Sequence, residues 1–208
     1  MTAILIKEPK QARSKALVHS ILETTTELLL SHGMKELTTN LIAQQSGVNI
    51  ASLYQYFPNK ESIVAKLIER HVDEEIQRIT AVMTEVAKES KSSGQGLIQE
   101  KNIRKIIKEF IDVHTENLQL TQLLHMQVSH LACRHMLQSA TLFLSTIFEK
   151  MLDKEGVFKG EDNTVRAYII TQSIDSLVQT TLIEHPDLFV KPVFLEELVQ
   201  LSMRYLLK

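Results

Sequence analysis

The chain has 208 residues, of which 44% are hydrophobic and 23% are charged, and its formal net charge at pH 7 is −2. This is the composition of a globular protein with room for one large domain or two smaller ones. No apolar run approaches the about 18 residues of a membrane span, and the first residues lack the basic start and apolar core of a signal peptide. The single cysteine, Cys133, excludes an internal disulfide framework and fits a reducing cytoplasm, which is the expected location.

The charge is divided unevenly along the chain. The first 60 residues carry six basic and four acidic residues, whereas the remainder carries 17 basic and 21 acidic residues. Lys10, Arg13 and Lys15 cluster near the start. A basic N-terminal part suits contact with nucleic acid, although short basic clusters at N-termini are usually just solvated.

The first predicted element is a helix over residues 12–31. Its apolar residues recur at helical spacing, and Gly33 closes it.

The next segment predicts two short helices joined by a tight turn. A hydroxyl oxygen of Thr38 or Thr39 caps the first, and Gly47 ends it because glycine adopts the left-handed conformation without a steric clash. Asn49 caps a second helix over residues 50–56, which a Phe-Pro pair stops. This pattern is a helix-turn-helix, whose second helix enters the major groove of DNA. The alternative is an ordinary corner between two helices that has no contact with DNA.

Several short motifs in this segment carry a family resemblance. The chain reads Thr-Thr-x-x-Ile-Ala from Thr38, Ser-Gly-Val-Asn from Ser46, Leu-Tyr-x-Tyr-Phe from Leu53 and Asn-Lys-Glu from Asn59. Together they resemble the DNA-binding domain of the TetR/AcrR family of bacterial transcriptional regulators, from residue 10 to about residue 70. Departures at Asn40-Leu41 and Ile50-Ala51-Ser52 lie near the base-reading surface, so the resemblance does not supply an operator sequence.

The resemblance also implies contacts with DNA. It assigns phosphate contacts to Thr39, Tyr54, Tyr56 and Lys60, and base-edge contacts to Asn49, Ile50, Ser52 and Gln55. Gln55 suits a bidentate contact with adenine, and Ile50 suits packing on a thymine methyl group. The alternative for Tyr54 and Tyr56 is a packing role. A phosphate near Lys60 would neutralise a cation that otherwise lies unfavourably at a helix N-terminus.

Beyond this segment the periodicity predicts helices almost throughout. They are expected at residues 60–89, 98–113, 116–125, 128–154, 163–184 and 193–208, with no strand. The predicted fold is therefore all-α. A three-helix DNA-binding domain spans residues 1–61, with its helix-turn-helix at about 38–57, and a larger helical effector-binding and dimerisation domain spans 62–208. The helix from residue 59 to 89 is a rod of about 45 Å, which in the family couples ligand binding to the spacing of the recognition helices.

The last two long helices are the expected dimer interface. Residues 163–184 and 193–208 carry apolar side chains at helical spacing, and pairing with a second copy would form a four-helix contact, as in the family. The alternative is that both helices are simply core of a monomer.

An effector site is expected among the helices of the larger domain. Candidate contacts for a small hydrophobic or amphipathic molecule are Phe110, His114, Met126, His130, Phe143, Tyr168, Gln172 and Asp175. Tyr168, Gln172 and Asp175 share one helical face, which is equally consistent with a solvated surface or a dimer contact. His130 and Cys133 stand three residues apart, but two ligands are weak evidence for a metal site, so no metal and no cofactor is expected.

These features predict a sequence-specific DNA-binding transcriptional regulator. The expected form is a homodimeric repressor that a small ligand releases from a palindromic, double-stranded operator. The alternatives are an activator or architectural factor of the same fold that is not ligand-gated, or a helical enzyme. The chain carries no nucleophile motif, phosphate loop or HExxH zinc motif, so an enzyme is not expected.

Overall fold

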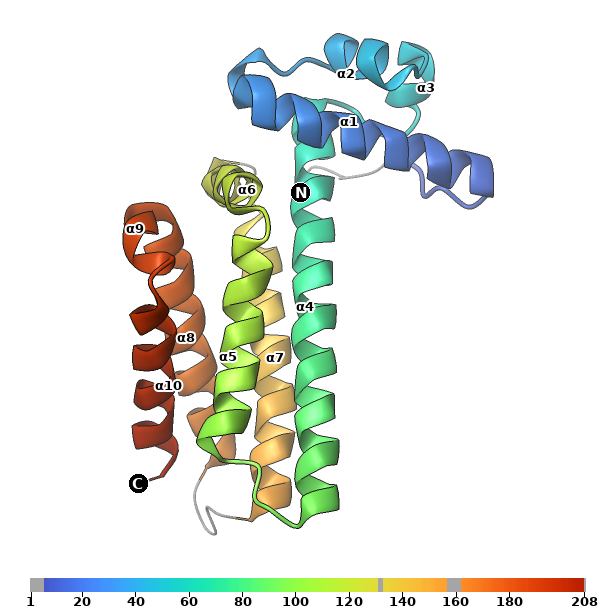
Figure 1. The fold of residues 1–208 in the computed structure, drawn as a ribbon. Helices are drawn as coiled ribbons and strands as arrows, with labels where there is room; N and C mark the ends of the chain where they lie inside the picture. Colours follow the sequence, from blue (N-terminus) through green and yellow to red (C-terminus); the bar gives the residue numbers. More distant parts are fainter. Residues whose placement is uncertain (1–5, 131–132, 157–161, 208) are drawn as a thin grey trace. The chain divides into compact units, whose positions relative to one another are not determined.

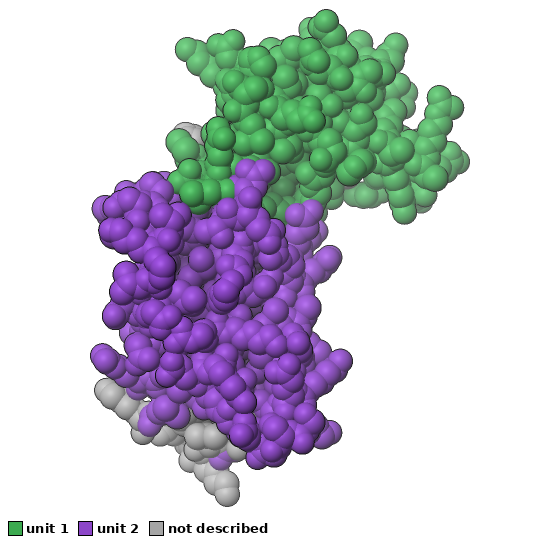
Figure 2. All heavy atoms as spheres, in the orientation of Figure 1, with its two compact units in different colours: residues 1–71, 118–134 green, residues 72–117, 135–208 purple. Residues whose placement is uncertain are grey.

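The computed structural model describes residues 6–130, 133–156 and 162–207, with side chains throughout these ranges except at positions 129, 130 and 155. The described residues form helices and connecting segments without any strand, which confirms the all-α prediction. The chain divides into two compact units, one of residues 1–71 and 118–134 and one of residues 72–117 and 135–208 (Figure 2). None of the described helices is long and apolar enough to cross a membrane.

The first unit contains the predicted helix-turn-helix. Its elements are α1 (Ala12–Glu36), α2 (Thr39–Ser46), α3 (Ile50–Tyr54), the start of α4 (Lys60–Ser93) and α6 (Leu118–His130) (Figure 1). The buried side of α1 carries Val18, Ile21, Leu22, Leu28 and Leu29, which recur at helical spacing. Gly33, with φ of 73°, interrupts the helical backbone of α1 near the predicted end.

The ends of the short helices are fixed by local contacts. Thr38 Oγ1 accepts a hydrogen bond from the Leu41 N–H at 3.1 Å, so Thr38 is the cap of α2. Gly47 adopts φ of 66° at the other end. Asn49 Oδ1 accepts from the Ala51 N–H at 2.8 Å and caps α3. These caps confirm the predicted turn, whereas α3 is shorter than the expected two turns and ends at Tyr54.

The helix α4 belongs to both units. It has 34 residues and a length of about 50 Å, so it extends one turn beyond the predicted end at residue 89. Its part up to His71 lies in the first unit, and its part from Val72 lies in the second. The structure groups α6 with α1 in the first unit, an association that no sequence pattern indicated.

The second unit is a helical bundle. Its other elements are α5 (Glu100–Thr115), α7 (Arg134–Glu155), α8 (Asn163–Glu184), α9 (Pro186–Phe189) and α10 (Pro192–Leu206). Within it α5 packs on α10, and α8 contacts both α9 and α10. The predicted loop at residues 185–192 contains the short helix α9, because Pro186 stands at its first turn with a backbone already suited to a helix.

Candidate DNA interface and effector cavity

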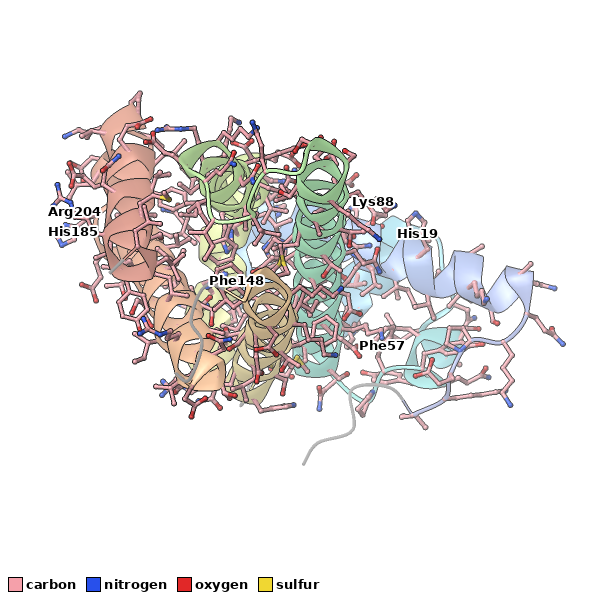
Figure 3. The ribbon with its side chains drawn as sticks, turned by 90° about the horizontal axis from the view of Figure 1, so that it is seen from below. His19, Phe57, Lys88, Phe148, His185 and Arg204 are labelled. Atoms are coloured by element: carbon pink, nitrogen blue, oxygen red, sulfur yellow. The ribbon has the colours of Figure 1, made fainter. Side chains whose placement is uncertain are left out.

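The helix α3 is anchored by its apolar side. The side chains of Leu53 and Phe57 are fully buried, and Figure 3 labels Phe57 within the first unit. On the other side of the same segment Ala51, Tyr54 and Gln55 are exposed. The packing of Leu53 and Phe57 therefore holds a short polar surface toward solvent, as a helix that reads DNA requires.

Two of the predicted phosphate contacts lie together. Thr39 Oγ1 and the Tyr54 hydroxyl are 2.9 Å apart, so a hydrogen bond joins the start of α2 to the end of α3. Tyr54 is 45% exposed and Thr39 is half-buried. Two hydroxyl groups carry two protons, of which this contact uses one. The second remains to donate to an anion.

The predicted base-edge residues surround α3. Asn49 and Gln55 are exposed at its two ends, and Ile50 and Ser52 are half-buried on its first turn. Asn49 uses its side-chain oxygen as the helix cap. Gln55 follows the helix directly, which leaves its carboxamide as the long polar group at this surface.

The other two predicted phosphate contacts have structural roles within the unit. The Lys60 ammonium donates hydrogen bonds to the Leu37 carbonyl at 2.8 Å and to the Met34 carbonyl at 3.1 Å. The sequence predicted that a phosphate neutralises the Lys60 cation. In the structure, carbonyl groups at the end of α1 are its hydrogen-bond acceptors. Tyr56 is only 8% exposed, as the packing alternative expected. Its carbonyl accepts a hydrogen bond from the Ile6 N–H at 2.8 Å.

The comparisons with known proteins agree with this geometry. Residues 21–67 match the family described as bacterial regulatory proteins, tetR family. The chain therefore carries a TetR-family DNA-binding domain. A TetR/AcrR-family regulator from Thermobifida fusca has the same fold, with a TM-score of 0.61 and 22% identity over 92% of this chain and 96% of that one. FadR from Bacillus subtilis, solved in complex with stearoyl-CoA, gives a TM-score of 0.62 and 19% identity over 89% of this chain and 97% of that one.

Similarity in sequence is confined to part of the chain. The nucleoid occlusion factor SlmA of Haemophilus ducreyi is 42% identical over 71 residues, which are 34% of this chain and 35% of that protein. The chain thus matches about a third of the length of these curated relatives. The TetR-family resemblance expected from residues 10 to about 70 is confirmed for the segment that the family model covers.

The second unit contains a cavity. It encloses about 660 Å³ of empty space, including its opening, between residues of α4, α5, α7, α8 and α10. Most of its wall is apolar, with Ile79, Met83, Ile107, Phe148, Ile174 and Leu206, and its polar residues are Thr141, Thr171, Asp175 and Ser202. Phe148 is buried among the helices in Figure 3, whereas Arg204 and His185 lie at the outside.

The predicted effector residues divide between this cavity and other places. Phe110 and Asp175 line the cavity, and His114 is buried one helical turn from Phe110. Met126 belongs to the first unit, is not among the residues that line the cavity, and is 57% exposed. The side chain of His130 lies outside the described residues.

Three further predicted residues do not line this cavity. Phe143 on α7 and Tyr168 on α8 are 49% and 47% exposed, and the Gln172 amide donates to the Ser176 hydroxyl at 3.1 Å. For Tyr168 and Gln172 the reason is that α8 has apolar residues on two sides, so the polar stripe did not identify the side that faces the core. Among the described residues no three His, Cys, Asp or Glu side chains gather as ligands for a metal ion.

A buried acidic group beside the cavity was not predicted. Glu75 on α4 is only 5% exposed, and its Oε2 lies 3.9 Å from His114 Nε2. Burial, and next the charge of Asp175, raise the pKa of Glu75 to about 8. The sequence signal was its spacing, because Glu75 stands three residues after Val72 and four before Ile79, at a core position of α4.

The helices α8 and α10 are apolar on more than one side. Of the residues used to predict the dimer interface, Ile170, Ile174 and Val178 are buried in the core of their own chain, whereas Leu177 and Leu201 are exposed. A second apolar set faces solvent, with exposed fractions of 41–56%: Val165, Tyr168, Ile169, Leu177, Ile183, Val193 and Leu201. The helices α8 and α10 stay candidates for the dimer interface, and the side chains of this second set are the ones exposed on them.

Proposed function

We propose that the chain is a homodimeric repressor that binds an inverted-repeat operator and leaves it when a small apolar or amphipathic molecule occupies the cavity of the second unit. The observation that carries this proposal is the cavity itself. It is a mostly apolar space of about 660 Å³, including its opening, with few polar groups, in the unit that does not contain the helix-turn-helix. Such a composition is typical of small-molecule sites.

The link between ligand and DNA runs through α4. Ile79 and Met83 of this helix line the cavity, and the same helix begins in the first unit. A ligand shifts DNA binding only if it binds the DNA-competent and DNA-incompetent states with different affinity. A change in the position of α4 between these states would provide that difference.

Dimerisation is supported by the apolar outer side of α8 and α10. A contiguous exposed apolar surface often marks an interaction site, and a second copy of the chain would cover this one. A symmetric dimer presents two recognition helices, which must lie about 34–36 Å apart to enter successive major grooves.

The relative with a bound ligand supports an apolar effector. FadR from Bacillus subtilis, which shares the fold, was solved with stearoyl-CoA, a molecule with a long acyl chain. We carry over only the idea that a bundle of this kind holds an apolar molecule, since the identity of 19% does not extend to the residues of the site.

The test is selection of randomised duplex DNA by the purified protein near physiological salt, followed by sequencing. We expect enrichment of an inverted repeat with half-sites about one helical turn apart, and release of that DNA by an organic extract of the source cells. If nothing is enriched even after unfolding and refolding to remove bound ligand, the DNA-binding part of the proposal is wrong. Enrichment with no effect of any extract would contradict ligand gating.

A second candidate is a DNA-binding factor of the same fold that has no ligand, an activator or architectural protein. The similarity to nucleoid occlusion factors over 71 residues favours it. It predicts operator binding that no small molecule changes, so the same experiment separates the two.

A further inference from the structure

The wall of the cavity has one acidic corner. Asp175 is the one charged residue among the described residues of the lining, which contains no lysine, arginine or histidine. A ligand with a carboxylate or phosphate would therefore meet a carboxylate and no cation. A ligand with a positive group would meet its opposite charge in an otherwise apolar space.

The carboxylate of Asp175 is held in place from two sides. Its Oδ2 accepts a hydrogen bond from the Thr141 hydroxyl at 3.0 Å, and its Oδ1 accepts one from the Gln179 amide at 2.7 Å. Each carboxylate oxygen has two acceptor sites, so these two bonds leave capacity for a further donor. The orientation is fixed before any ligand arrives, which lowers the entropic cost of binding.

A second carboxyl group lies behind this corner. Glu75 is buried, and this burial, followed by the charge of Asp175, raises the pKa of its carboxyl group. The nearest cationic candidate is His114, whose Nε2 lies 3.9 Å from Glu75 Oε2, too far for a hydrogen bond. The Nδ1 of His114 lies 2.7 Å from the Phe110 carbonyl and must be the donor there, because a carbonyl only accepts. The corner thus has two carboxyl groups and no close permanent cation among the described residues.

We infer that the effector is an apolar molecule with one protonated amine, which donates to Asp175 at the acidic corner while its apolar part lies against Ile107, Phe148 and Leu206. This inference rests on the proposed function of the cavity and names the chemical class of its ligand. The ammonium gains a paired, hydrogen-bonded partner that offsets the cost of its removal from water. A neutral alcohol gains only an ordinary hydrogen bond, and an acid is repelled.

The experiment uses three probes that share one chain and differ in the head group: decylammonium, 1-decanol and decanoate. Binding to the full-length protein is measured by isothermal titration calorimetry at neutral pH. We expect decylammonium to bind with one molecule per protomer and about tenfold or more tightly than either other probe. Asp175→Asn should bring decylammonium to the affinity of 1-decanol. Asp187→Asn makes the same chemical change at an exposed aspartate on α9. This control variant should still bind decylammonium more tightly than 1-decanol or decanoate.

Three results would overturn the inference. They are a tighter or equal affinity for 1-decanol or decanoate, no binding of decylammonium, or an unchanged preference in Asp175→Asn. The comparison of the three probes on the unsubstituted protein needs no variant, so it decides the matter even if Asp175→Asn does not fold.

The operator selected above separates this inference from the proposed function. If 1-decanol releases the operator and decylammonium does not, the proposal of ligand gating stands and the inference of an amine effector is wrong. If decylammonium binds more tightly than the other probes but does not change the affinity for the operator, the amine site stands and the proposal of ligand gating is wrong.

Discussion

The hydroxyl groups of Thr39 and Tyr54 lie 2.9 Å apart, and this contact joins two residues that are 15 positions apart in the chain. It fixes the direction of the exposed Tyr54 ring at the end of α3. A phosphate that approaches this pair would meet a hydroxyl group already held in position, which favours a charge-assisted hydrogen bond.

Tyr54→Phe removes one hydroxyl and keeps the ring. We expect affinity for every duplex to fall by a similar factor, equivalent to about 0.5–1.5 kcal/mol, because a phosphate contact carries no sequence information. Fluorescence anisotropy measures the affinity of the variant for the selected operator and for an unrelated duplex. Tyr56→Phe is the matched control, since that side chain is buried, and it should bind as the unsubstituted protein does. A loss restricted to one sequence would assign Tyr54 to a base.

Gln55→Ala tests the reading of a base edge. The carboxamide of Gln55 is exposed after α3, so its loss should relax the preference at one symmetric pair of operator positions, at a cost of about 1–3 kcal/mol. Repeated selection with the variant would show which positions lose their preference. Gln45→Ala, at an exposed glutamine of α2, serves as the comparison. Equal losses on all sequences would refute the assignment.

Lys60→Met tests whether this residue acts on folding or on DNA. The ammonium donates to the Met34 and Leu37 carbonyls, so its removal should lower the free energy of unfolding by about 1.5–3 kcal/mol. Urea denaturation measures this change, with Lys35→Met, at an exposed position of α1, as control. Unchanged stability together with weaker binding to all duplexes would restore the phosphate role expected from the family resemblance.

Glu75→Gln tests the buried acid through pH. Because the pKa of Glu75 rises from 4.5 to about 8 in the folded chain, the folded state keeps a proton that the unfolded state loses between these values. The free energy of unfolding should therefore fall as pH rises through this window. Asp175 faces Glu75 from α8 and His114 faces it from α5, and burial raises the pKa of Asp175 as well, which adds a dependence of the same sign.

The variant removes the contribution of Glu75 alone. At pH of about 8.5 it should be more stable than the unsubstituted protein by at least about 1.4 kcal/mol, the equivalent of one pKa unit, with a smaller difference near pH 5. Urea denaturation at the two pH values provides the measurement, and Glu74→Gln, at an exposed neighbour, is the control. An equal pH dependence in both variants would show that Glu75 ionises normally.

Leu177→Lys tests the outer side of α8. Leu177 is 42% exposed, and burying a lysine there in an apolar contact should weaken the dimer by about 100-fold or more. Analytical ultracentrifugation over a range of concentrations measures this dissociation. Leu142→Lys changes a residue of α7 that is 52% exposed and should leave the dimer intact. A monomeric unsubstituted protein, or equal weakening by both variants, would refute this interface.

Local signals explain why the helix-turn-helix was predicted well. Thr38, Gly47 and Asn49 act through backbone groups two to four residues away, so the sequence contains both partners of each cap. The helix at 163–184 was predicted with its observed bounds. Asp162 caps its start, and apolar residues recur at helical spacing along its whole length. The family resemblance added the function of this segment, which spacing alone does not contain.

Contacts between distant segments explain what was missed. The carbonyl partners of Lys60 lie 23 and 26 residues earlier, at the place where Gly33 breaks α1, and no side-chain pattern marks them. In α8 the apolar residues are too many to distinguish the inner side from the outer side. The cavity wall combines five helices, and of the predicted effector residues whose side chains the structure describes, Phe110 and Asp175 fell within it.

The first unit is discontinuous, since it consists of residues 1–71 and 118–134. During synthesis on a ribosome, the helix-turn-helix therefore emerges well before α6, the helix that completes the unit. The part of α1 that contacts α6 is therefore covered only after α5 has also been made. A gene fragment that ends after residue 71 would encode the DNA-reading helices without this covering segment, and is a poor choice for producing the DNA-binding part alone.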